Sequence, residues 1–301
     1  MQGKERFVFL NNRIVPISKA SIETNDRGLL LGDGLFETMR THSGEFIFYD
    51  LHLERLKSSL EILGISMDLD ERRMERSIRK LKEINGFGCR EEVCLRLTIT
   101  RGAGGRGLLP QCDLQPTVIM SLSPCLPLDK KSFKVQIAKI RRNESSPLSR
   151  IKSLSCLDNV LIRKEAHREG KDEALVFNTQ GKLVEASAFN VFLIKNNILF
   201  TPPVTDGALA GVTRKIILAL SKEAGLSSLE KSIFCEELFS ADEIFLTNSL
   251  AGIMPLSYIG DYEIPKNLLK MRVLKLQKVY AQYIERKVAS LEKFEAKESI
   301  C

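Results

Sequence analysis

Two kinds of hydrophobic spacing take turns along this chain, and that alternation limits the fold more than any other feature. Residues 93–100 place an apolar side chain at every second position, as a half-buried strand does. An Asn11-Asn12 turn between two short apolar segments indicates a hairpin. Other leucines follow the three- and four-residue steps of one helix face, namely Leu53, Leu56, Leu60 and Leu63. This mixture predicts an α+β fold rather than a doubly wound parallel sheet.

The expected elements fall into two domains. A polar, proline-rich stretch at 123–131 has the composition of a linker. We therefore expect a small N-terminal α/β domain over residues 1–122 and a larger C-terminal α/β domain over 132–301. In the small domain, Asp50 is expected to cap a helix that stops at Gly64. In the larger domain we expect helices over 157–168, 213–223 and from about 266, and strands over 135–140, 173–177, 183–194, 198–200 and 243–247.

The charge balance is mildly basic and unclustered. Lysine and arginine outnumber aspartate and glutamate by 45 to 38, and basic residues stand beside acidic ones, as at 90–92. This pattern excludes a cationic tract for nucleic acid and favours local cations that bind a small anionic substrate. No apolar run approaches the roughly 20 residues of a membrane span. We expect neither a nucleic-acid nor a membrane partner.

Cysteine and histidine usage argues against disulfides and metals. The seven cysteines contain no Cys-x-x-Cys pair, and their odd number suits reduced thiols. The three histidines are scattered, so no metal site is expected. The first residues hold no apolar signal core, and we therefore expect a cytoplasmic protein.

Lys152 and Glu185 are the first candidates for chemistry. A lysine amine forms a Schiff base with an aldehyde cofactor when its pKa is lowered, and Lys152 lies in a loop that opens a helix. A carboxylate in a strand, such as Glu185, could pair with a protonated pyridine nitrogen. The alternatives are a solvated surface lysine and an edge-strand carboxylate that faces water.

Two segments have the features of phosphate sites. Gly211 precedes Val212 and Thr213 at an expected helix start, where free N–H groups and the helix dipole favour an anion. Residues 247–249 bring hydroxyl and amide groups to a strand end, and Arg55 could send a guanidinium to the same phosphate. The alternatives are an ordinary N-cap by Thr213 and an exposed helix arginine.

The glycine-rich loop Arg101–Gly107 is not a Walker loop, because no Gly-Lys-Ser/Thr follows it. It offers a flexible backbone with two cations, which suits bidentate binding of a carboxylate. The alternative is a mobile hairpin.

Taken in order, these motifs resemble the fold-type IV (class IV) pyridoxal-phosphate enzymes. The resemblance runs from about residue 11 to 255 and includes the stretches 26–38, 52–56, 151–154, 172–174, 184–192, 211–214 and 247–255. It implies a homodimer of two-domain subunits, in which the larger domain is a pseudo-barrel and the site lies between the domains. It also implies pyridoxal 5'-phosphate as cofactor.

The resemblance assigns a role to individual residues. Lys152 would be the Schiff-base lysine and proton shuttle, and Glu185 the partner of the pyridine nitrogen. Leu209 would pack on the ring. The phosphate would be held by Arg55, Val212, Thr213 and Ser249. Both residues of the Lys152–Glu185 pair are present, which disfavours a scaffold that kept the fold without the cofactor.

Within the family, three features favour the lyases that convert 4-amino-4-deoxychorismate to 4-aminobenzoate and pyruvate. Thr38 is a hydroxyl residue where branched-chain enzymes carry glycine, the Arg101–Gly107 loop is similar to the lyase loop, and Asn248 resembles the lyase segment. Thr38 would then assist catalysis. Phe36, Arg106 and Asn248 would contact the substrate. The alternative is an aminotransferase that acts on branched-chain or D-amino acids with 2-oxoglutarate.

Overall fold

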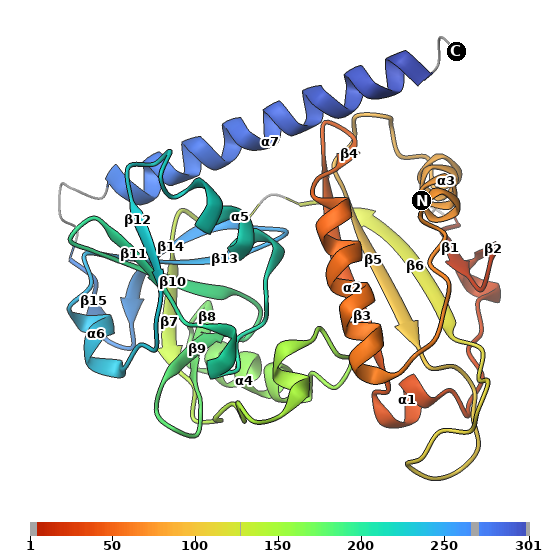
Figure 1. The fold of residues 1–301 in the computed structure, drawn as a ribbon, viewed down its shortest axis with the longest axis horizontal. Coiled ribbons are helices and arrows are strands. Elements are labelled where there is room, and N and C mark those ends of the chain that lie inside the picture. The colour runs from red at the N-terminus through yellow and green to blue at the C-terminus, as the bar shows by residue number, and fades with distance from the viewer. Residues whose placement is uncertain (1–4, 127, 266–270, 299–301) are drawn as a thin grey trace. The chain divides into compact units, whose positions relative to one another are not determined.

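The computed structural model describes residues 5–126, 128–265 and 271–298, which form two compact units (Figure 1). Unit 1 comprises the chain up to Leu126 together with Lys152–Ser155, and unit 2 comprises the rest. The fold is the expected α+β type. Two details differ from the expected domain limits: a strand continues to Pro124, and Lys152–Ser155 belongs to the first unit because its backbone pairs there.

Unit 1 is a six-stranded sheet with helices packed on it. The strand order is β2-β1-β6-β5-β3-β4, and all the pairings in it are antiparallel. The strands are β1 (Phe7–Leu10), β2 (Arg13–Pro16), β3 (Gly34–His42), β4 (Glu45–Phe46), β5 (Val93–Thr100) and β6 (Thr117–Pro124). The helices are α1 (Arg27–Leu31), α2 (Tyr49–Leu63) and α3 (Glu71–Ile84).

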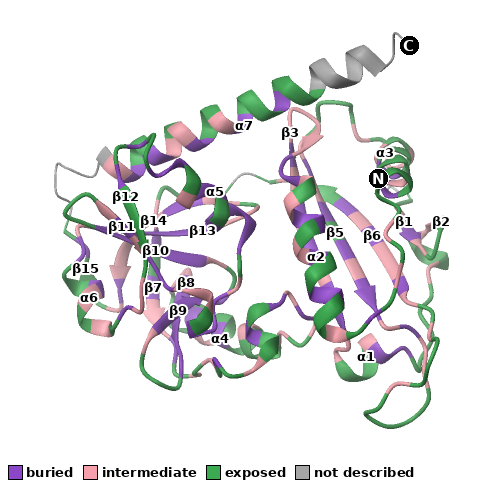
Figure 2. Ribbon diagram, viewed as in Figure 1, coloured by how far each residue is buried: buried purple, intermediate pink, exposed green. Residues whose placement is uncertain are grey.

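The alternation in β5 makes one face of this sheet the core of unit 1. Leu95, Leu97 and Ile99 are fully buried, and the helical leucines of α2 are buried except the last. The buried strands β3 and β5 stand out in Figure 2. The expected cap of α2 was wrong: the helix begins at Tyr49 after Phe48, whose φ of 59° turns the chain, and Asp50 lies within the first turn.

Unit 2 is built on a nine-stranded sheet. The order is β12-β11-β10-β13-β14-β7-β8-β9, and β15 pairs with β14. The strands are β7 (Phe133–Ile137), β8 (Glu173–Phe177), β9 (Leu183–Ala186), β10 (Asn190–Lys195), β11 (Ile198–Thr201), β12 (Ser227–Glu230), β13 (Glu243–Asn248), β14 (Gly252–Ile259) and β15 (Tyr262–Glu263). The helices are α4 (Leu157–Arg168), α5 (Val212–Leu220), α6 (Cys235–Phe239) and α7 (Met271–Glu298).

The sheet of unit 2 curls around its core as a half-barrel. β9 lies at one end of the strand order yet also lies beside β10, and buried side chains from both strands join one cluster. The strand expected over 183–194 is broken at residues 187–189, because the Ala186 N–H donates to the Phe189 carbonyl and turns the chain. This break lies next to Glu185.

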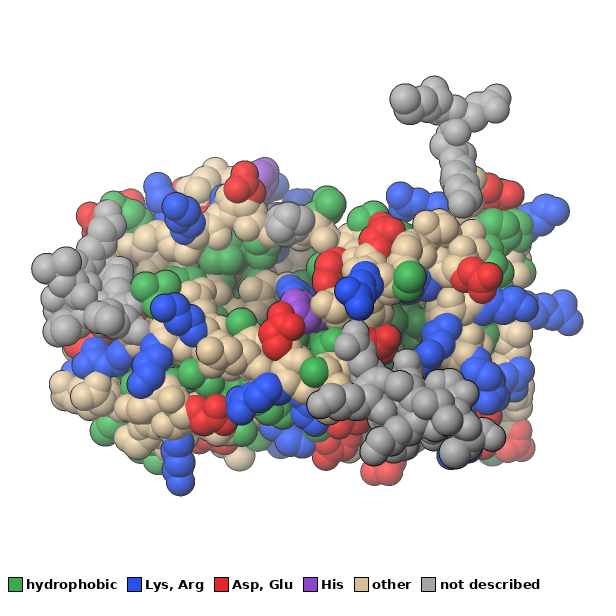
Figure 3. Space-filling view, turned by 90° about the horizontal axis from the view of Figure 1, so that it is seen from above, with side chains coloured by type: hydrophobic (Ala, Val, Ile, Leu, Met, Phe, Trp, Pro, Cys, Tyr) green, Lys and Arg blue, Asp and Glu red, His purple; other side chains and the backbone are tan. Residues whose placement is uncertain are grey.

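Helix α7 packs on β13 and β14. The Val273 N–H donates to Oε2 of the buried Glu243 at 3.1 Å, and Gln277 donates to the Ile253 carbonyl at 2.9 Å. The helix was expected from about residue 266, and residues 266–270 lie outside the described residues. Among the helices of the described ranges, none is both long and apolar enough to cross a membrane. Acidic and basic side chains are interspersed over the face drawn in Figure 3.

Candidate active site

Lys152 is positioned by backbone pairing with β3. The Phe36 N–H donates to the Lys152 carbonyl at 2.9 Å, and the Leu154 N–H donates to the Gly34 carbonyl at the same distance. Lys152 is half-buried rather than exposed, and its Nζ lies 4.4 Å from the centroid of the Phe36 ring. Such a distance is typical of a cation–π contact. The backbone therefore fixes where the amine is presented.

The face of the sheet beside Lys152 carries several of the predicted residues. Phe36 and Thr38 alternate with buried positions of β3, so both project from the same face. In the register, Thr38 lies opposite Arg96, whose guanidinium lies 4.0 Å from the Phe36 ring centroid. Unit 1 thus brings together Lys152, Phe36, Thr38 and an arginine that the sequence had not indicated.

The opposite face of β3 holds a buried ionic group that includes Arg55. Arg55 donates from Nε to Oε1 of Glu37 at 2.8 Å and from Nη2 to Oε2 at 2.6 Å. Nδ1 of His52 lies 2.7 Å from the same Oε2. The Arg55 side chain is only 12% exposed, so it is no ordinary surface arginine.

This environment sets the ionisation of Glu37 and His52. Burial opposes the charge of Glu37, but the Arg55 charge and the hydrogen bonds from His52 and Arg55 outweigh it and lower its pKa to about 2. Glu37 is therefore ionised, and His52 supplies the hydrogen between them. Burial lowers the pKa of His52, an effect that the hydrogen bond with Glu37 opposes and the charges of Arg55 and Lys152 reinforce. Glu37 thus holds Arg55 directly and is itself held by His52, and no sequence signal had singled out either residue.

Arg106 lies in the exposed part of the glycine-rich loop between β5 and β6. Arg101 at the start of that loop is 14% exposed and binds Asp33, so only one of the two loop arginines is exposed.

In unit 2, Glu185 is buried although β9 lies at one end of the strand order. It is 7% exposed, which rules out a carboxylate that faces water. Oε2 accepts the Leu209 N–H at 3.1 Å, and Oε1 accepts a hydrogen bond from Arg142 at 3.3 Å. Arg142 also donates to Asn159 at 3.0 Å. These contacts connect two predicted cofactor residues, Glu185 and Leu209, directly.

The start of α5 has the features of an anion site. The helix begins at Val212, and its N-cap is Gly211, which provides no side-chain hydrogen bond; the N-cap alternative for Thr213 is therefore wrong. Oγ1 of Thr213 is buried and has no hydrogen-bond partner among the described residues. A Cβ at Gly211 would lie 1.9 Å from Oδ1 of Asn190, so a larger residue at this position would force the Asn190 side chain to move.

The third predicted segment ends β13. Asn248 donates to the Ala188 carbonyl at 3.2 Å and accepts the N–H groups of Leu250 and Ala251 at 3.0 and 2.7 Å. Its amide therefore shapes the turn that contains Ser249. Oγ1 of the fully buried Thr247 has no hydrogen-bond partner among the described residues.

A family model described as amino-transferase class IV matches residues 34–259. A D-alanine aminotransferase of Bacillus licheniformis is 32% identical over 84% of this chain and 88% of its own length. An aminodeoxychorismate lyase of Bacillus subtilis is 31% identical over 84% and 87%. A branched-chain aminotransferase structure from Thermoproteus uzoniensis matches with a TM-score of 0.85 and 27% identity, covering 93% of this chain and 95% of that one.

The chain belongs to the class IV aminotransferase family. Enzymes of this family use pyridoxal 5'-phosphate. The described residues fit that cofactor: Lys152 offers an amine, Glu185 a buried carboxylate, and the uncapped start of α5 offers N–H groups beside the orphaned Thr213 hydroxyl. In the described part of the chain, no group of histidine, cysteine, aspartate and glutamate side chains is arranged to hold a metal ion.

Proposed function

We propose that this protein is a lyase that converts 4-amino-4-deoxychorismate to 4-aminobenzoate and pyruvate. The observation that carries the proposal is the position of Thr38. Its side chain projects from the same face of β3 as Phe36, over whose ring the Lys152 amine lies. A hydroxyl group near the amine suits a reaction in which an ether oxygen leaves, whereas amine transfer needs no acid at that point.

Each cofactor residue of the proposed enzyme has its own role. Lys152 would hold pyridoxal 5'-phosphate covalently through Nζ, and Glu185 would pair with its pyridine nitrogen. The phosphate would be bound by Arg55, Val212, Thr213 and Ser249, and Leu209 would pack on the ring. When bound, the cofactor withdraws electrons from the amine-bearing carbon of the substrate.

The protein side chains then move the protons. Once the substrate amine has displaced Lys152 from the cofactor, the freed Nζ would accept the proton from the amine-bearing carbon. The bond between the ring carbon and the ether oxygen of the enolpyruvyl group would break as the ring becomes aromatic. Oγ1 of Thr38 donates a hydrogen bond to the departing oxygen, and the released enolpyruvate takes up one proton to become pyruvate. Arg106 binds a substrate carboxylate. Asn248 orients the substrate through the turn that its amide holds.

A class IV aminotransferase for branched-chain or D-amino acids is the second candidate. Similarity to the D-alanine aminotransferase and to the branched-chain aminotransferase structure supports it. Such an enzyme would transfer the amine of leucine or D-alanine to 2-oxoglutarate.

One assay separates the two candidates. The purified holoenzyme is given enzymatically generated 4-amino-4-deoxychorismate in one reaction, and leucine or D-alanine with 2-oxoglutarate in another. We expect fluorescent 4-aminobenzoate in the first and little glutamate in the second. Rapid glutamate formation without 4-aminobenzoate would reject the lyase.

The hydroxyl of Thr38 is tested by two substitutions. Thr38→Ala should lower kcat by about 10²-fold, the usual effect of losing a positioned proton donor, while Thr38→Ser should retain most activity. Equal activity of all three proteins would remove Thr38 from the mechanism.

Borohydride reduction and peptide mapping test the cofactor link separately: the label should lie on Lys152.

The proposal extends to assembly and location. We propose a cytoplasmic homodimer, which light scattering coupled to size exclusion would report as twice the mass of the chain.

A further inference from the structure

The loop that carries Arg106 is held on both sides of that residue by residues 25–33. Before Arg106, Gly104 exchanges hydrogen bonds with Asn25: its N–H donates to the Asn25 carbonyl at 3.1 Å, and the Asn25 amide donates to its carbonyl at 3.2 Å. After Arg106, the carbonyl groups of Gly107 and Leu108 accept hydrogen bonds from Arg27 at 3.0 and 2.6 Å. The exposed residue thus lies between two fixed points.

Arg27 is unusual for an arginine because it is 4% exposed. A Cβ at Gly104 would lie 3.0 Å from Cδ of Arg27, so the glycine lets the loop backbone wrap closely around the side chain. The Arg27 N–H also donates to the Gly102 carbonyl at 2.9 Å. The buried side chain therefore serves as the support on which the loop folds.

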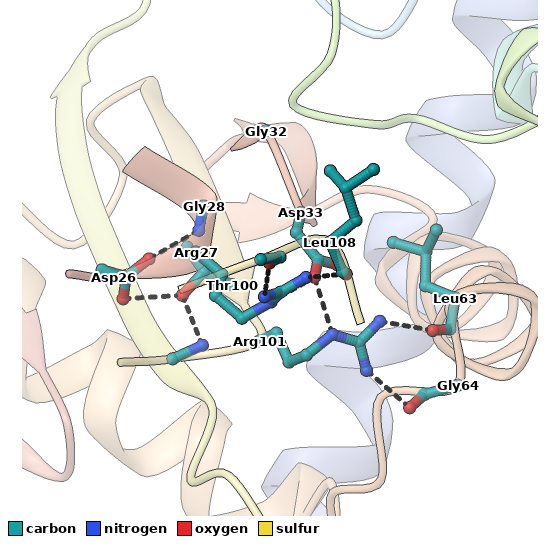
Figure 4. Close-up of polar contacts among 12 residues, drawn as sticks. Asp26, Arg27, Gly28, Gly32, Asp33, Leu63, Gly64, Thr100, Arg101 and Leu108 are labelled. Atoms are coloured by element: carbon teal, nitrogen blue, oxygen red, sulfur yellow. Dashed lines mark hydrogen bonds and ion pairs between the residues drawn. The ribbon is translucent and has the colours of Figure 1, made fainter. Parts of the chain in front are cut away.

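Asp33 neutralises Arg27 and connects it to helix α2. Oδ2 of Asp33 accepts hydrogen bonds from Nε of Arg27 at 2.9 Å and from Nε of Arg101 at 2.7 Å (Figure 4). Arg101 then donates to the carbonyls of Leu63 and Gly64 at 2.6 and 2.8 Å, where α2 ends. Arg27, Asp33 and Arg101 are called the Asp33 cluster below.

The contacts within the Asp33 cluster favour a single arrangement of its side chains. Burial opposes ionisation of Asp33, but the hydrogen bonds and charges of Arg101 and Arg27 prevail and lower its pKa. A carboxylate oxygen shared by two guanidinium groups is a strong, charge-assisted contact. Each guanidinium still has terminal nitrogens that reach two backbone carbonyls, which a lysine ammonium cannot match in the same planar arrangement.

We infer that Arg27 is a positioning residue for the substrate: with Asp33 it holds the loop in the one conformation in which Arg106 meets the substrate carboxylate. This inference rests on the proposed function, because that function gives Arg106 its ligand. A glycine-rich loop that had to order itself at each binding event would lose affinity through its conformational entropy. Arg27 removes that cost by ordering the loop in advance.

The test has a structural readout and a kinetic one. Arg27→Lys keeps the charge opposite Asp33 but loses the hydrogen bonds to the two loop carbonyls. Asp33→Asn weakens the contacts that Arg27 and Arg101 make with residue 33. Arg90→Lys, at an exposed arginine of the same unit, is the matched control. The holoenzymes are digested briefly with trypsin, and intact-mass spectrometry follows cleavage after Arg106. We expect cleavage about tenfold faster in both cluster variants and unchanged in the control, since proteolysis follows local opening.

The kinetic readout is the lyase reaction. Arg27→Lys should raise KM about tenfold with kcat within about threefold, because uniform binding is lost. Arg106→Ala should raise KM at least as much. Adding Arg27→Lys to Arg106→Ala should raise KM no further, because Arg27 acts through Arg106.

The outcomes separate this inference from the proposed function. Wild-type protein without lyase activity refutes the proposed function, and the trypsin result still decides whether Arg27 orders the loop. Unchanged cleavage in Arg27→Lys overturns the inference. Faster cleavage with an unchanged KM, or additive effects in the double variant, overturns the link to the substrate.

Discussion

At the residue scale, Glu37 shows how the surrounding side chains stabilise a buried charge. It is 1% exposed, and alone it would be costly to bury. Arg55 and His52 satisfy both of its oxygens. The same contacts fix the orientation of Arg55, which the proposed enzyme needs for the cofactor phosphate.

Glu37→Gln should therefore destabilise the protein in a pH-dependent way. A pKa lowered from 4.5 to about 2 corresponds to about 3 kcal/mol of stability. Because the folded-state pKa is the lower one, this stability is present above about pH 4.5 and is lost as the pH falls toward 2. Urea unfolding at several pH values measures the free energy of unfolding of both proteins. The difference between wild type and Glu37→Gln should be constant near neutral pH and should become smaller in acid.

The control for this prediction is Glu61→Gln on helix α2 of the same unit, where the side chain is exposed. It should change stability by less than about 0.5 kcal/mol. A difference between wild type and Glu37→Gln that does not vary with pH would contradict the assignment of the effect to ionisation.

At the residue scale, motifs in the sequence singled out candidate residues but did not indicate which side chains would contact them. Lys152, Glu185 and Arg55 occur in recognisable stretches. Glu37 and His52 looked like ordinary members of a strand and a helix, because only the packing of α2 on β3 brings them together. The sequence signal that could have indicated this ionic group was an acidic residue at a position of β3 that faces the core.

At the scale of elements, clean periodicity predicted structure well. The strands over 93–100 and 173–177 and the helix over 157–168 are confirmed with the same bounds. The prediction of a single strand over 183–194 was wrong at residues 187–189. A buried segment has no alternation of polar and apolar residues from which a turn could be located. The start of α5 was misplaced by one residue, since its cap is a glycine without a side-chain signal.

The approach to α5 gives a prediction for Gly211→Ala. The φ of Gly211 is −66°, so the backbone tolerates alanine, but the new Cβ would lie 1.9 Å from Oδ1 of Asn190. The Asn190 side chain also donates to the Leu209 carbonyl, so its displacement would disturb the contact that holds the approach to α5. We expect pyridoxal 5'-phosphate to bind the apoenzyme about tenfold more weakly, or about 1.4 kcal/mol.

Titration of the apoenzyme by visible absorbance measures this change. Gly88→Ala is the matched control, because a Cβ there would meet nothing nearer than 3.9 Å. Equal dissociation constants for Gly211→Ala and wild type would refute a phosphate site at the start of α5.

At the scale of the whole molecule, each unit has its own core. Leu97 in unit 1 and Leu246 in unit 2 are both fully buried, and each lies in a central strand. Substitution of either by alanine should cost about 2–5 kcal/mol in urea unfolding, because each leaves a cavity. Leu229→Ala, at a 52% exposed position of β12, should cost less than about 0.5 kcal/mol. A small effect at Leu97 or Leu246 would contradict the close packing of that core.

The division into units was harder to predict than the fold class. Composition predicted a linker over residues 123–131, but no sequence signal showed that Lys152–Ser155 returns to the first unit. That return depends on three-dimensional pairing with β3, which leaves no mark on local composition.

The return of Lys152–Ser155 to unit 1 means that the two halves of this chain cannot be exchanged as modules. A fragment that stopped at residue 126 would lack both Lys152 and the short segment whose backbone pairs with Gly34 and Phe36. Recombination between relatives, or fusion of one half to another protein, would have to carry residues 152–155 along with the first half.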